Sequence, residues 1–348
     1  VLLIMNRSNV KRLALREWIC LLNQSSSVTW LDQVPSNPTY LDVFHSLSAL
    51  KGKTPDLVVA IGGGSTIDLA KSCVGFSYLI NGRRLAAEAV LDSLRTKEYR
   101  NHPTGIPIIA IPTTAGTGSE VTQWATVWDK EAEVKYSIDA AHLRPKRAYI
   151  VPEYTLSMPK RLTLSTGLDA LCQAVEAYWA KASSPMVKEL AKTALRLIVD
   201  HLPKVLSDPG NLYLREKVCL GSVFSGLAFS NTRTTACHSI SYPLTMRYGV
   251  EHGLACALSL SKVMEVNLPA IQEAKELLAA LGVRNAGEVQ EWLDKITDGI
   301  VRLRLSSFGV QEKDIPKLVG MCFTLGRMDN NPVALTPGEV EQILRAIL

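Results

Sequence analysis

The sequence predicts an α/β domain over residues 1–154, followed by an all-α domain over residues 155–348. In the first part, short runs that are apolar throughout alternate with helix-like stretches, which is typical of a parallel sheet covered on both faces. From about Leu156 onward, apolar residues recur with a spacing of about 3.6 residues and β-branched runs disappear. A chain of 348 residues also suits two hydrophobic cores better than one.

Four apolar runs in the first part are the predicted strands, at residues 2–5, 28–30, 56–61 and 107–112. Helices are expected around residues 12–22 and after the glycine turn that follows the third strand. In the second part, the longest predicted helices cover residues 169–181, 186–202 and 212–228. The stretch from Pro152 to Pro159 is expected to contain the domain boundary.

The composition excludes several classes of function. Hydrophobic residues make up 47% and charged residues 20% of the chain, which predicts a compact soluble protein. The net charge is +5, but the basic residues are dispersed, which argues against nucleic-acid binding. Seven cysteines without a CxxC pair indicate reduced thiols and a cytoplasmic location. No apolar run reaches the roughly 18 residues of a membrane helix, and helical faces rich in Leu and Ala suit a homodimer or an internal core equally well.

Two glycine-rich turns follow neighbouring predicted strands. Gly62–Thr66 lies between a strand and a helix, where glycine backbone and a helix N-terminus can hold a diphosphate. It is neither a P-loop nor a GxGxxG sequence, so a plain strand-to-helix turn is the alternative. Thr113–Glu120 is a second polar turn, for which the alternative is a helix-capping loop. Because parallel strands end at one edge of a sheet, the two turns together predict a nucleotide site.

Four further residues form a candidate metal site. Asp169 and Gln173 are four residues apart in a predicted helix, so they share one face. His238 and His252 are fourteen residues apart, and Gly253 suggests a close turn beside the second histidine. A carboxylate with two imidazoles is a ligand set that borderline divalent metals favour. Each histidine taken singly is more often a core or surface residue.

In this order, the motifs resemble those of the iron-containing (group III) alcohol dehydrogenase family. The matching segments are residues 62–71, residues 112–120, the helix of Asp169, and residues 238–253. The resemblance implies a Rossmann-like sheet domain and an all-α domain in a dehydroquinate synthase-like architecture, with a cleft between them. It also implies reduction of a small aldehyde to a primary alcohol by NADPH or NADH. A divalent metal, Fe²⁺ first and Zn²⁺ as the alternative, would polarise the aldehyde oxygen.

The resemblance assigns the metal ligands to Asp169, His238, His252 and Gln173, and the catalytic set to Tyr242 and the two histidines. Gln173 stands where the family usually has a histidine, and its amide oxygen is a weaker and harder ligand. Weaker binding, three-ligand coordination, a metal other than iron and loss of the metal therefore stay open. Tyr242 also stands where a histidine is usual, and a reference pKa of about 10 makes it a poorer acid.

The resemblance further assigns the cofactor contacts. They are Asn6, Gly62, Gly63, Gly64, Ser65, Asp68, Thr113, Thr114, Thr117, Ser119, Thr126, Lys135 and Phe229. Lys135 is expected near the ribose and Phe229 near the nicotinamide. NAD-selective relatives place a carboxylate at the end of the first strand, whereas residues 5–9 contain none and offer Arg7 to a 2′-phosphate. NADPH is therefore predicted to be accepted and preferred.

Five shorter segments resemble phosphonoacetaldehyde reductases within the family, which reduce phosphonoacetaldehyde to 2-hydroxyethylphosphonate. These segments are residues 125–129, 135–137, 234–236, 241–245 and 326–332. The predicted phosphonate contacts are Arg233, Thr234, Thr235, Arg327 and Asn331, because a dianion favours guanidinium and hydroxyl groups. Arg233 could instead pair with a carboxylate or cap a helix.

Several other functions stay open at this point. One is another alcohol dehydrogenase of the family, and a second is a metal-independent reductase of the maleylacetate reductase kind. A third is a relative of glycerol-phosphate dehydrogenase or dehydroquinate synthase. The last is a nucleotide-binding relic without catalysis.

Overall fold

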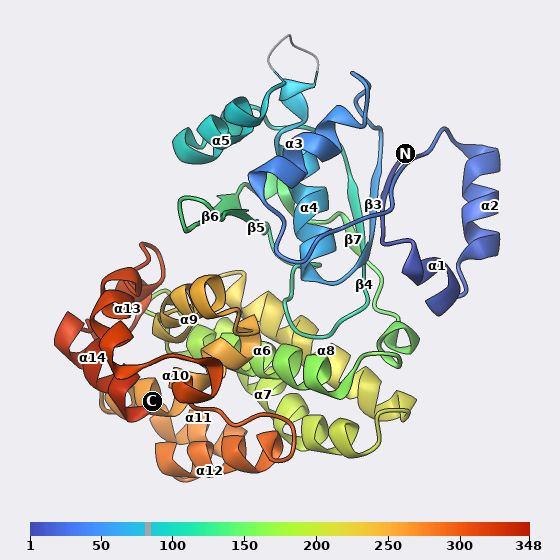
Figure 1. Ribbon diagram of the computed structural model, residues 1–348. Helices are drawn as coiled ribbons and strands as arrows, with labels where there is room; N and C mark the ends of the chain where they lie inside the picture. Colours follow the sequence, from blue (N-terminus) through green and yellow to red (C-terminus); the bar gives the residue numbers. More distant parts are fainter. Residues whose placement is uncertain (81–84) are drawn as a thin grey trace. The chain divides into compact units, whose positions relative to one another are not determined.

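The computed structural model describes residues 1–80 and 85–348, which form two compact units (Figure 1). The first unit contains residues 1–114 and 119–157. The second contains residues 158–348 together with the short segment 115–118. None of the helices in the described parts of the chain is long and apolar enough to cross a membrane.

The first unit is built on a five-stranded parallel sheet with the strand order β2-β1-β3-β4-β7. The strands are β1 (Leu2–Ile4), β2 (Thr29–Leu31), β3 (Val58–Gly62), β4 (Ile108–Pro112) and β7 (Arg147–Ala148). Leu2, Ile4 and Val58 pack into a core on one face of this sheet, while Leu3 and Val59 pack into a core on the other. The predicted parallel sheet, with apolar side chains on both faces, is confirmed.

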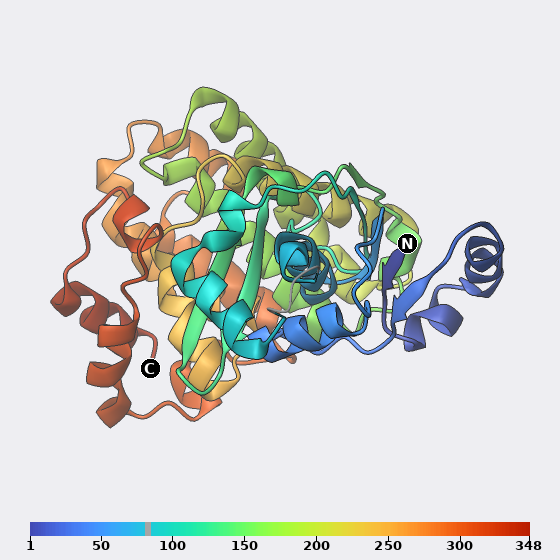
Figure 2. The same cartoon turned by 90° about the horizontal axis from the view of Figure 1, so that it is seen from above.

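Helices cover both faces of the sheet. They are α1 (Ser8–Arg12), α2 (Arg16–Ser25), α3 (Tyr40–Ser48), α4 (Gly64–Gly75) and α5 (Ala87–Thr96). Figure 2 shows α1 and α2 on the side of the sheet opposite to α3, α4 and α5. The single helix expected around residues 12–22 is divided in two, because Ala14 takes a left-handed conformation with φ of 53° between α1 and α2.

An antiparallel hairpin completes the first unit and was not predicted. Its strands are β5 (Trp124–Asp129) and β6 (Val134–Asp139). Ala125, Val127 and Ile138 join the core that contains α3, α4 and α5. The alternation of buried and exposed residues along these strands is incomplete, so the sequence pattern did not reveal them.

The second unit is built from helices, as predicted. They are α6 (Lys160–Trp179), α7 (Pro185–Ser207), α8 (Leu212–Phe229), α9 (Ala236–Tyr248), α10 (His252–Asn267), α11 (Ala274–Leu281), α12 (Ala286–Thr297), α13 (Ile315–Met321) and α14 (Pro337–Ala346). The α6 helix is buried along nearly its whole length, because α7, α8 and α10 pack around it (Figure 1). Ser184 and Asn211 cap α7 and α8 by accepting backbone N–H groups of the first turn.

Candidate cofactor and metal sites

The predicted nucleotide turns meet at the carboxyl edge of the parallel sheet. Gly63 follows β3 and caps α4, and Thr114 follows β4. A Cβ atom on Gly63 would lie only 3.2 Å from Thr114 Oγ1, and Thr113 N donates to Gly62 O at 3.0 Å. Adjacent parallel strands thus bring the two turns together, as predicted from their order. The α4 N-terminus at this edge presents backbone N–H groups that can hold a phosphate.

A network of buried hydrogen bonds holds the second glycine-rich turn in place. Ser119 Oγ donates to Asp68 Oδ1 at 2.6 Å, and Thr126 N donates to Asp68 Oδ2 at 2.9 Å. Lys71 Nζ donates to Ser119 Oγ at 2.9 Å and to Trp124 O at 2.7 Å. Burial lowers the pKa of Lys71 to about 8 and raises the pKa of Asp68. Asp68 and Ser119 therefore hold the turn and the β5–β6 hairpin in place, and Lys71 is a member that sequence reasoning missed.

The end of β1 carries Asn6 and Arg7, and their side chains are both engaged. Asn6 Oδ1 accepts from Val34 N at 2.6 Å, which ties β1 to the loop after β2. Arg7 Nη2 forms an ion pair with Asp32 Oδ2 at 2.6 Å. Asp32 supplies a carboxylate at this edge, contrary to the expectation from residues 5–9 alone. It follows β2, which pairs in parallel with β1, so the sheet brings an acid beside Arg7 that the first strand alone does not show.

Two of the predicted cofactor contacts lie in the second unit. Thr117 belongs to segment 115–118, and Phe229 is the last residue of α8. Gly118 has a φ of +60°, and a Cβ atom there would lie 2.6 Å from Gly226 Cα and 3.1 Å from Phe229 Cε1. Only glycine permits this approach, so the segment packs directly on the end of α8.

A cluster of four potential metal ligands lies among α6, α9 and α10. Asp169, His238, His252 and Cys256 each offer one ligand atom, and these atoms all lie within 4.8 Å of one another. Asp169 Oδ1 lies 3.3 Å from His238 Nε2 and 3.9 Å from His252 Nε2. The structure therefore brings together the predicted carboxylate and both predicted histidines, and it adds a cysteine.

Gly253 explains how α10 reaches α6. The sequence suggested a close turn at this glycine, but Gly253 lies in the first turn of α10. A Cβ atom there would lie 1.8 Å from Ser165 O and 2.9 Å from Asp169 N. The missing side chain therefore lets the start of α10 approach the α6 backbone, which places His252 beside Asp169.

Buried polar atoms of the cluster fit a bound cation. Asp169 Oδ1 and His238 Nε2 are buried and have no hydrogen-bond partner among the residues that the structure describes. Burial of such atoms is unfavourable unless a hydrogen bond or an ion compensates it. Burial acts to lower the pKa of His238, but Cys256, Glu176 and Asp169 raise it well above its usual value. The site thus favours a positive charge at Nε2, either a proton or a divalent ion.

Glu176 orients His238 from the opposite side. It is fully buried on α6, and its Oε2 atom lies in hydrogen-bond contact with His238 Nδ1. Its Oε1 atom accepts from the backbone N atoms of Cys237 at 2.7 Å and Thr235 at 3.1 Å. Metal-binding histidines usually have such a carboxylate partner, which fixes the ring and its tautomer. Sequence reasoning missed Glu176, although it stands seven residues after Asp169 on the same helix face.

Gln173 and Tyr242 flank the cluster. Gln173 is buried one turn after Asp169 on α6, and its Oε1 atom accepts from Ser225 Oγ at 3.4 Å. The ring of Tyr242 stacks on the ring of His252, with centroids 5.9 Å apart and an angle of 15° between the planes.

Two arginine side chains lie against Gly326, and one of them also contacts Tyr242. Arg327 Nε donates to Tyr242 Oη at 3.3 Å, and Arg327 Nη1 donates to Gly326 O at 2.9 Å. Arg233 has a left-handed φ of 66°, and a Cβ atom on Gly326 would lie 2.6 Å from Arg233 Nη1. The two predicted phosphonate-binding arginines therefore converge on Gly326, which was not predicted to have a role.

Thr235 and Asn331, two of the predicted substrate contacts, make hydrogen bonds inside the helical unit. Both are fully buried. Thr235 Oγ1 donates to Glu176 Oε1 at 2.9 Å and accepts from Trp179 Nε1 at 2.8 Å. The Asn331 amide exchanges two hydrogen bonds with Asn267, at 2.9 and 2.8 Å.

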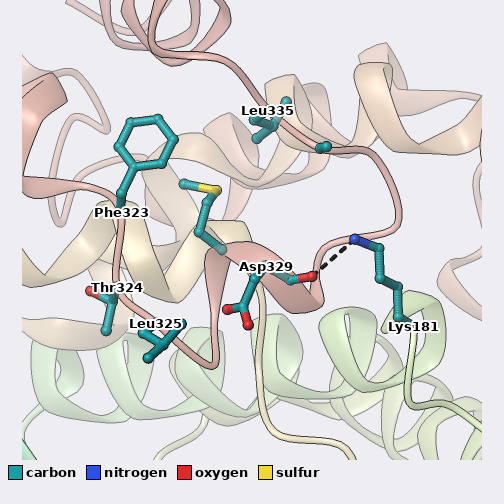
Figure 3. Close-up of a pocket in the computed structure, with 8 residues that line it drawn as sticks. Lys181, Phe323, Thr324, Leu325, Asp329 and Leu335 are labelled. Atoms are coloured by element: carbon teal, nitrogen blue, oxygen red, sulfur yellow. Dashed lines mark hydrogen bonds between the residues drawn. The ribbon is translucent and has the colours of Figure 1, made fainter.

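A largely apolar pocket of 270 Å³ lies beside the segment that carries Gly326 and Arg327 (Figure 3). It is lined by Lys181, Phe323, Thr324, Leu325, Met328, Asp329, Ala334 and Leu335. Lys181 Nζ donates to Asp329 O at 2.9 Å across one side of it. None of the four clustered ligands lines this pocket.

Comparison with protein families assigns the class. Residues 1–152 match the model described as iron-containing alcohol dehydrogenase, and residues 163–348 match that of the Fe-containing alcohol dehydrogenase family, C-terminal. The chain therefore belongs to the iron-containing alcohol dehydrogenase family. The predicted class, an NAD(P)-dependent alcohol dehydrogenase or aldehyde reductase, is confirmed, as are the predicted cofactors of the family.

Individual relatives differ in their substrates. Phosphonoacetaldehyde reductase of Streptomyces viridochromogenes is 31% identical over 89% of this chain and 81% of its own length. The 1,3-propanediol dehydrogenase of Klebsiella pneumoniae is also 31% identical, over 91% of this chain and 82% of its own length. A crystal structure of sulfoacetaldehyde reductase from Bifidobacterium kashiwanohense in complex with NAD⁺ is 28% identical with a TM-score of 0.84. It covers 99% of this chain and 90% of that one.

Proposed function

We propose that this chain reduces phosphonoacetaldehyde to 2-hydroxyethylphosphonate, with NADPH or NADH as the hydride donor. The observation that carries the proposal is the convergence of Arg233 and Arg327 on Gly326. Guanidinium groups bind tetrahedral oxyanions through paired, charge-assisted hydrogen bonds, and two of them match the charge of a phosphonate dianion.

The position of these arginines relative to the metal cluster supports a short substrate. Arg327 donates to Tyr242, and the Tyr242 ring stacks on His252. Phosphonoacetaldehyde has a single methylene group between phosphorus and the carbonyl carbon, so its anionic and reactive ends need neighbouring sites. Arg327 contacts Tyr242, which contacts His252, so a site for the anionic group lies next to the metal cluster.

The residues of the cluster hold and orient the reacting groups. A divalent ion held by Asp169 and the two histidines would supply Lewis-acid polarisation of the aldehyde oxygen, and the nicotinamide would supply the hydride. Glu176 holds His238 in one orientation, and Tyr242 is the proposed hydrogen-bond donor to the substrate oxygen. Arg327 holds the Tyr242 hydroxyl in place for that contact.

The relatives support the same substrate class without selecting one member. The names of two of them, phosphonoacetaldehyde reductase and sulfoacetaldehyde reductase, describe aldehydes that bear an oxyanion. A 1,3-propanediol dehydrogenase is equally similar at 31% identity, so overall identity does not distinguish an anionic substrate from a neutral one. The arginine pair is the feature that favours the anionic substrate.

Oxidation of NADPH and of NADH with three aldehydes tests the proposal. Phosphonoacetaldehyde, sulfoacetaldehyde and neutral propionaldehyde differ mainly in the charge of the terminal group. We expect kcat/KM for phosphonoacetaldehyde to exceed that for propionaldehyde by about 100-fold, the effect of one or two charge-assisted hydrogen bonds. Equal kcat/KM values for the charged and neutral aldehydes would refute the proposal. A higher kcat/KM for sulfoacetaldehyde than for phosphonoacetaldehyde would instead identify a sulfonate-bearing aldehyde as the substrate.

Two variants and a chelator complete the test. Arg233→Met is expected to bring kcat/KM for phosphonoacetaldehyde down to the level of propionaldehyde, while kcat/KM for propionaldehyde changes little. Arg327→Met is expected to lower kcat/KM for both aldehydes, and more strongly for phosphonoacetaldehyde, because Arg327 also holds the Tyr242 hydroxyl. Full activity after chelation would instead indicate a metal-independent reductase. Binding of NADPH without turnover of any aldehyde would indicate a nucleotide-binding relic.

A further inference from the structure

We propose that Cys256 is the fourth protein ligand of the divalent metal, and that Gln173 lies outside the ligand set. The inference rests on the metal site that the proposed function uses and specifies its composition. Sequence position alone favours Gln173, whereas the structure places the Cys256 sulfur within 4.8 Å of the ligand atoms of Asp169, His238 and His252.

The helix geometry explains why Cys256 reaches the cluster. His252 and Cys256 are four residues apart on α10, so their side chains leave the same helix face. Gly253 lets that face approach the α6 backbone at Ser165 and Asp169. Cys256 is fully buried there, and its Sγ atom lies 4.0 Å from His252 Nε2.

The spacing of the ligand atoms matches a tetrahedral site. Bonds of roughly 2.0–2.3 Å from a zinc-like ion to nitrogen, oxygen and sulfur place the ligand atoms about 3.3–3.7 Å apart. The observed separations are 3.3 Å for Asp169 to His238, 3.9 Å for Asp169 to His252 and 4.0 Å for Cys256 to His252. The remaining pairs of ligand atoms lie within 4.8 Å of one another, so a contraction of at most about 1–1.5 Å would complete the coordination.

The environment of Cys256 differs from that of a cysteine in an ordinary core. Cys322, for comparison, donates through its sulfur to Leu318 O at 3.2 Å, so a backbone carbonyl satisfies its thiol. Cys256 has its Sγ atom 4.0 Å from a histidine nitrogen, His252 Nε2. It also lies beside two buried atoms that lack a hydrogen-bond partner among the described residues, Asp169 Oδ1 and His238 Nε2. A shared cation would satisfy all three groups at once.

Gln173 is a weaker candidate ligand for the same ion than Cys256. Its amide oxygen already contacts the Ser225 hydroxyl on α8, and an amide oxygen is a hard, neutral ligand. A thiolate at Cys256 and the carboxylate of Asp169 together neutralise a divalent ion, and the thiol proton passes to solvent as the ion binds. Sulfur and imidazole ligands favour Zn²⁺ and Co²⁺, so these ions should compete well with Fe²⁺ in this chain.

Absorption spectroscopy of the Co²⁺-loaded full-length protein tests the inference. A thiolate bound to Co²⁺ gives a charge-transfer band in the near ultraviolet, which oxygen and nitrogen ligands do not give. We expect this band in the wild-type protein and in Gln173→Ala, and its loss in Cys256→Ser. Cys256→Ser should also raise the Kd for Zn²⁺ by more than about tenfold, while Gln173→Ala changes it by less than about twofold.

Cys172→Ser is the matched control, because Cys172 is also fully buried and lies on α6 beside Gln173. It should keep the band. Absence of the band from wild-type protein, or its persistence in Cys256→Ser, would overturn the inference. If Cys256→Ser does not fold, X-ray absorption of the wild-type cobalt protein decides, since a sulfur neighbour supports the ligand and a shell of oxygen and nitrogen alone refutes it. These readouts do not depend on turnover, so they stand apart from the test of the aldehyde.

Discussion

The Glu176 carboxylate accepts a hydrogen bond from His238 Nδ1, which leaves His238 Nε2 facing Asp169 Oδ1 at 3.3 Å. The same carboxylate is fixed by the backbone N–H groups of Thr235 and Cys237 at the start of α9. One side chain on α6 therefore sets both the position of α9 and the tautomer of its histidine. This arrangement prepares Nε2 to donate its lone pair to a cation.

Glu176→Gln should weaken metal binding without removing a ligand. An amide cannot accept all the hydrogen bonds that the carboxylate accepts, and loss of such a partner typically lowers metal affinity by about 10–100-fold. Chelator competition with Zn²⁺ would measure the change. Glu273→Gln is the control, because Glu273 pairs with Lys188 on the exposed surface of the same unit. Equal affinities of the two variants would contradict the role assigned to Glu176.

Gly326→Ala should damage recognition of the phosphonate group specifically. The new Cβ atom would lie 2.6 Å from Arg233 Nη1, so the guanidinium must move, and the φ of +77° costs a residue with a side chain about 1–2 kcal/mol. We expect KM for phosphonoacetaldehyde to rise by about tenfold, equivalent to about 1.4 kcal/mol, with little change for propionaldehyde.

Gly320→Ala is the matched control for this substitution. Gly320 lies in α13, has no atom within 4 Å of a Cβ position and has no positive φ. Alanine there should stabilise the protein slightly and leave both KM values unchanged. A parallel loss of activity toward the charged and the neutral aldehyde in Gly326→Ala would point to general strain instead of a displaced arginine.

Asp32→Asn should shift cofactor use toward NADPH. Asp32 holds Arg7 in an ion pair at 2.6 Å. If the cofactor ribose binds at this edge of the sheet, as proposed, the Asp32 carboxylate would repel a 2′-phosphate there. The substitution removes the repulsion and releases Arg7, so we expect the ratio of kcat/KM for NADPH to that for NADH to rise by at least about tenfold. Asp56→Asn removes an equal charge from an exposed position just before β3, and it should leave the ratio unchanged.

The features that could be predicted are those that local sequence determines. The runs around β1, β3 and β4 are apolar throughout, which identifies a parallel sheet, and the glycine turns follow them directly. Asp169, His238 and His252 could be predicted to cluster because each lies in a short segment that resembles a motif of the family. The hairpin β5–β6 was missed, since its packing depends on α4 and α5 more than on its own pattern.

The features that could not be predicted depend on the packing of distant segments. Asp32 reaches Arg7 only through the parallel pairing of β2 with β1. Cys256 stands one helical turn after His252, but that spacing alone does not distinguish a metal ligand from an ordinary core cysteine. Its sulfur indicates a ligand only because it lies close to Asp169 Oδ1, which has no hydrogen-bond partner among the described residues. In the sequence, Glu176 is not distinguished from other residues of its helix. Its role appears only in the fold, where it binds Cys237 N and His238 Nδ1 of α9.

Lys71 provides a last prediction, which concerns stability and pH. Its ammonium group is fully buried beneath the second nucleotide turn, and burial lowers its pKa from 10.5 to about 8. Below about pH 8 the group is charged in both the folded and the unfolded chain, so the folded state bears the full cost of burying the charge. Between about pH 8 and 10.5 the folded state releases the proton first, so the free energy of unfolding rises with pH in this window.

A comparison with Lys71→Met isolates this contribution, because methionine keeps much of the side-chain length and never carries a charge. From pH 7 to pH 9.5 the wild-type protein should gain about 2 kcal/mol relative to the variant, given about 1.4 kcal/mol for each pH unit between the folded-state pKa of about 8 and pH 9.5. Urea unfolding at the two pH values measures the gain. An identical pH dependence in both proteins would show that Lys71 titrates alike in the folded and unfolded chains, and that the bonds to Ser119 and Trp124 fully offset its burial.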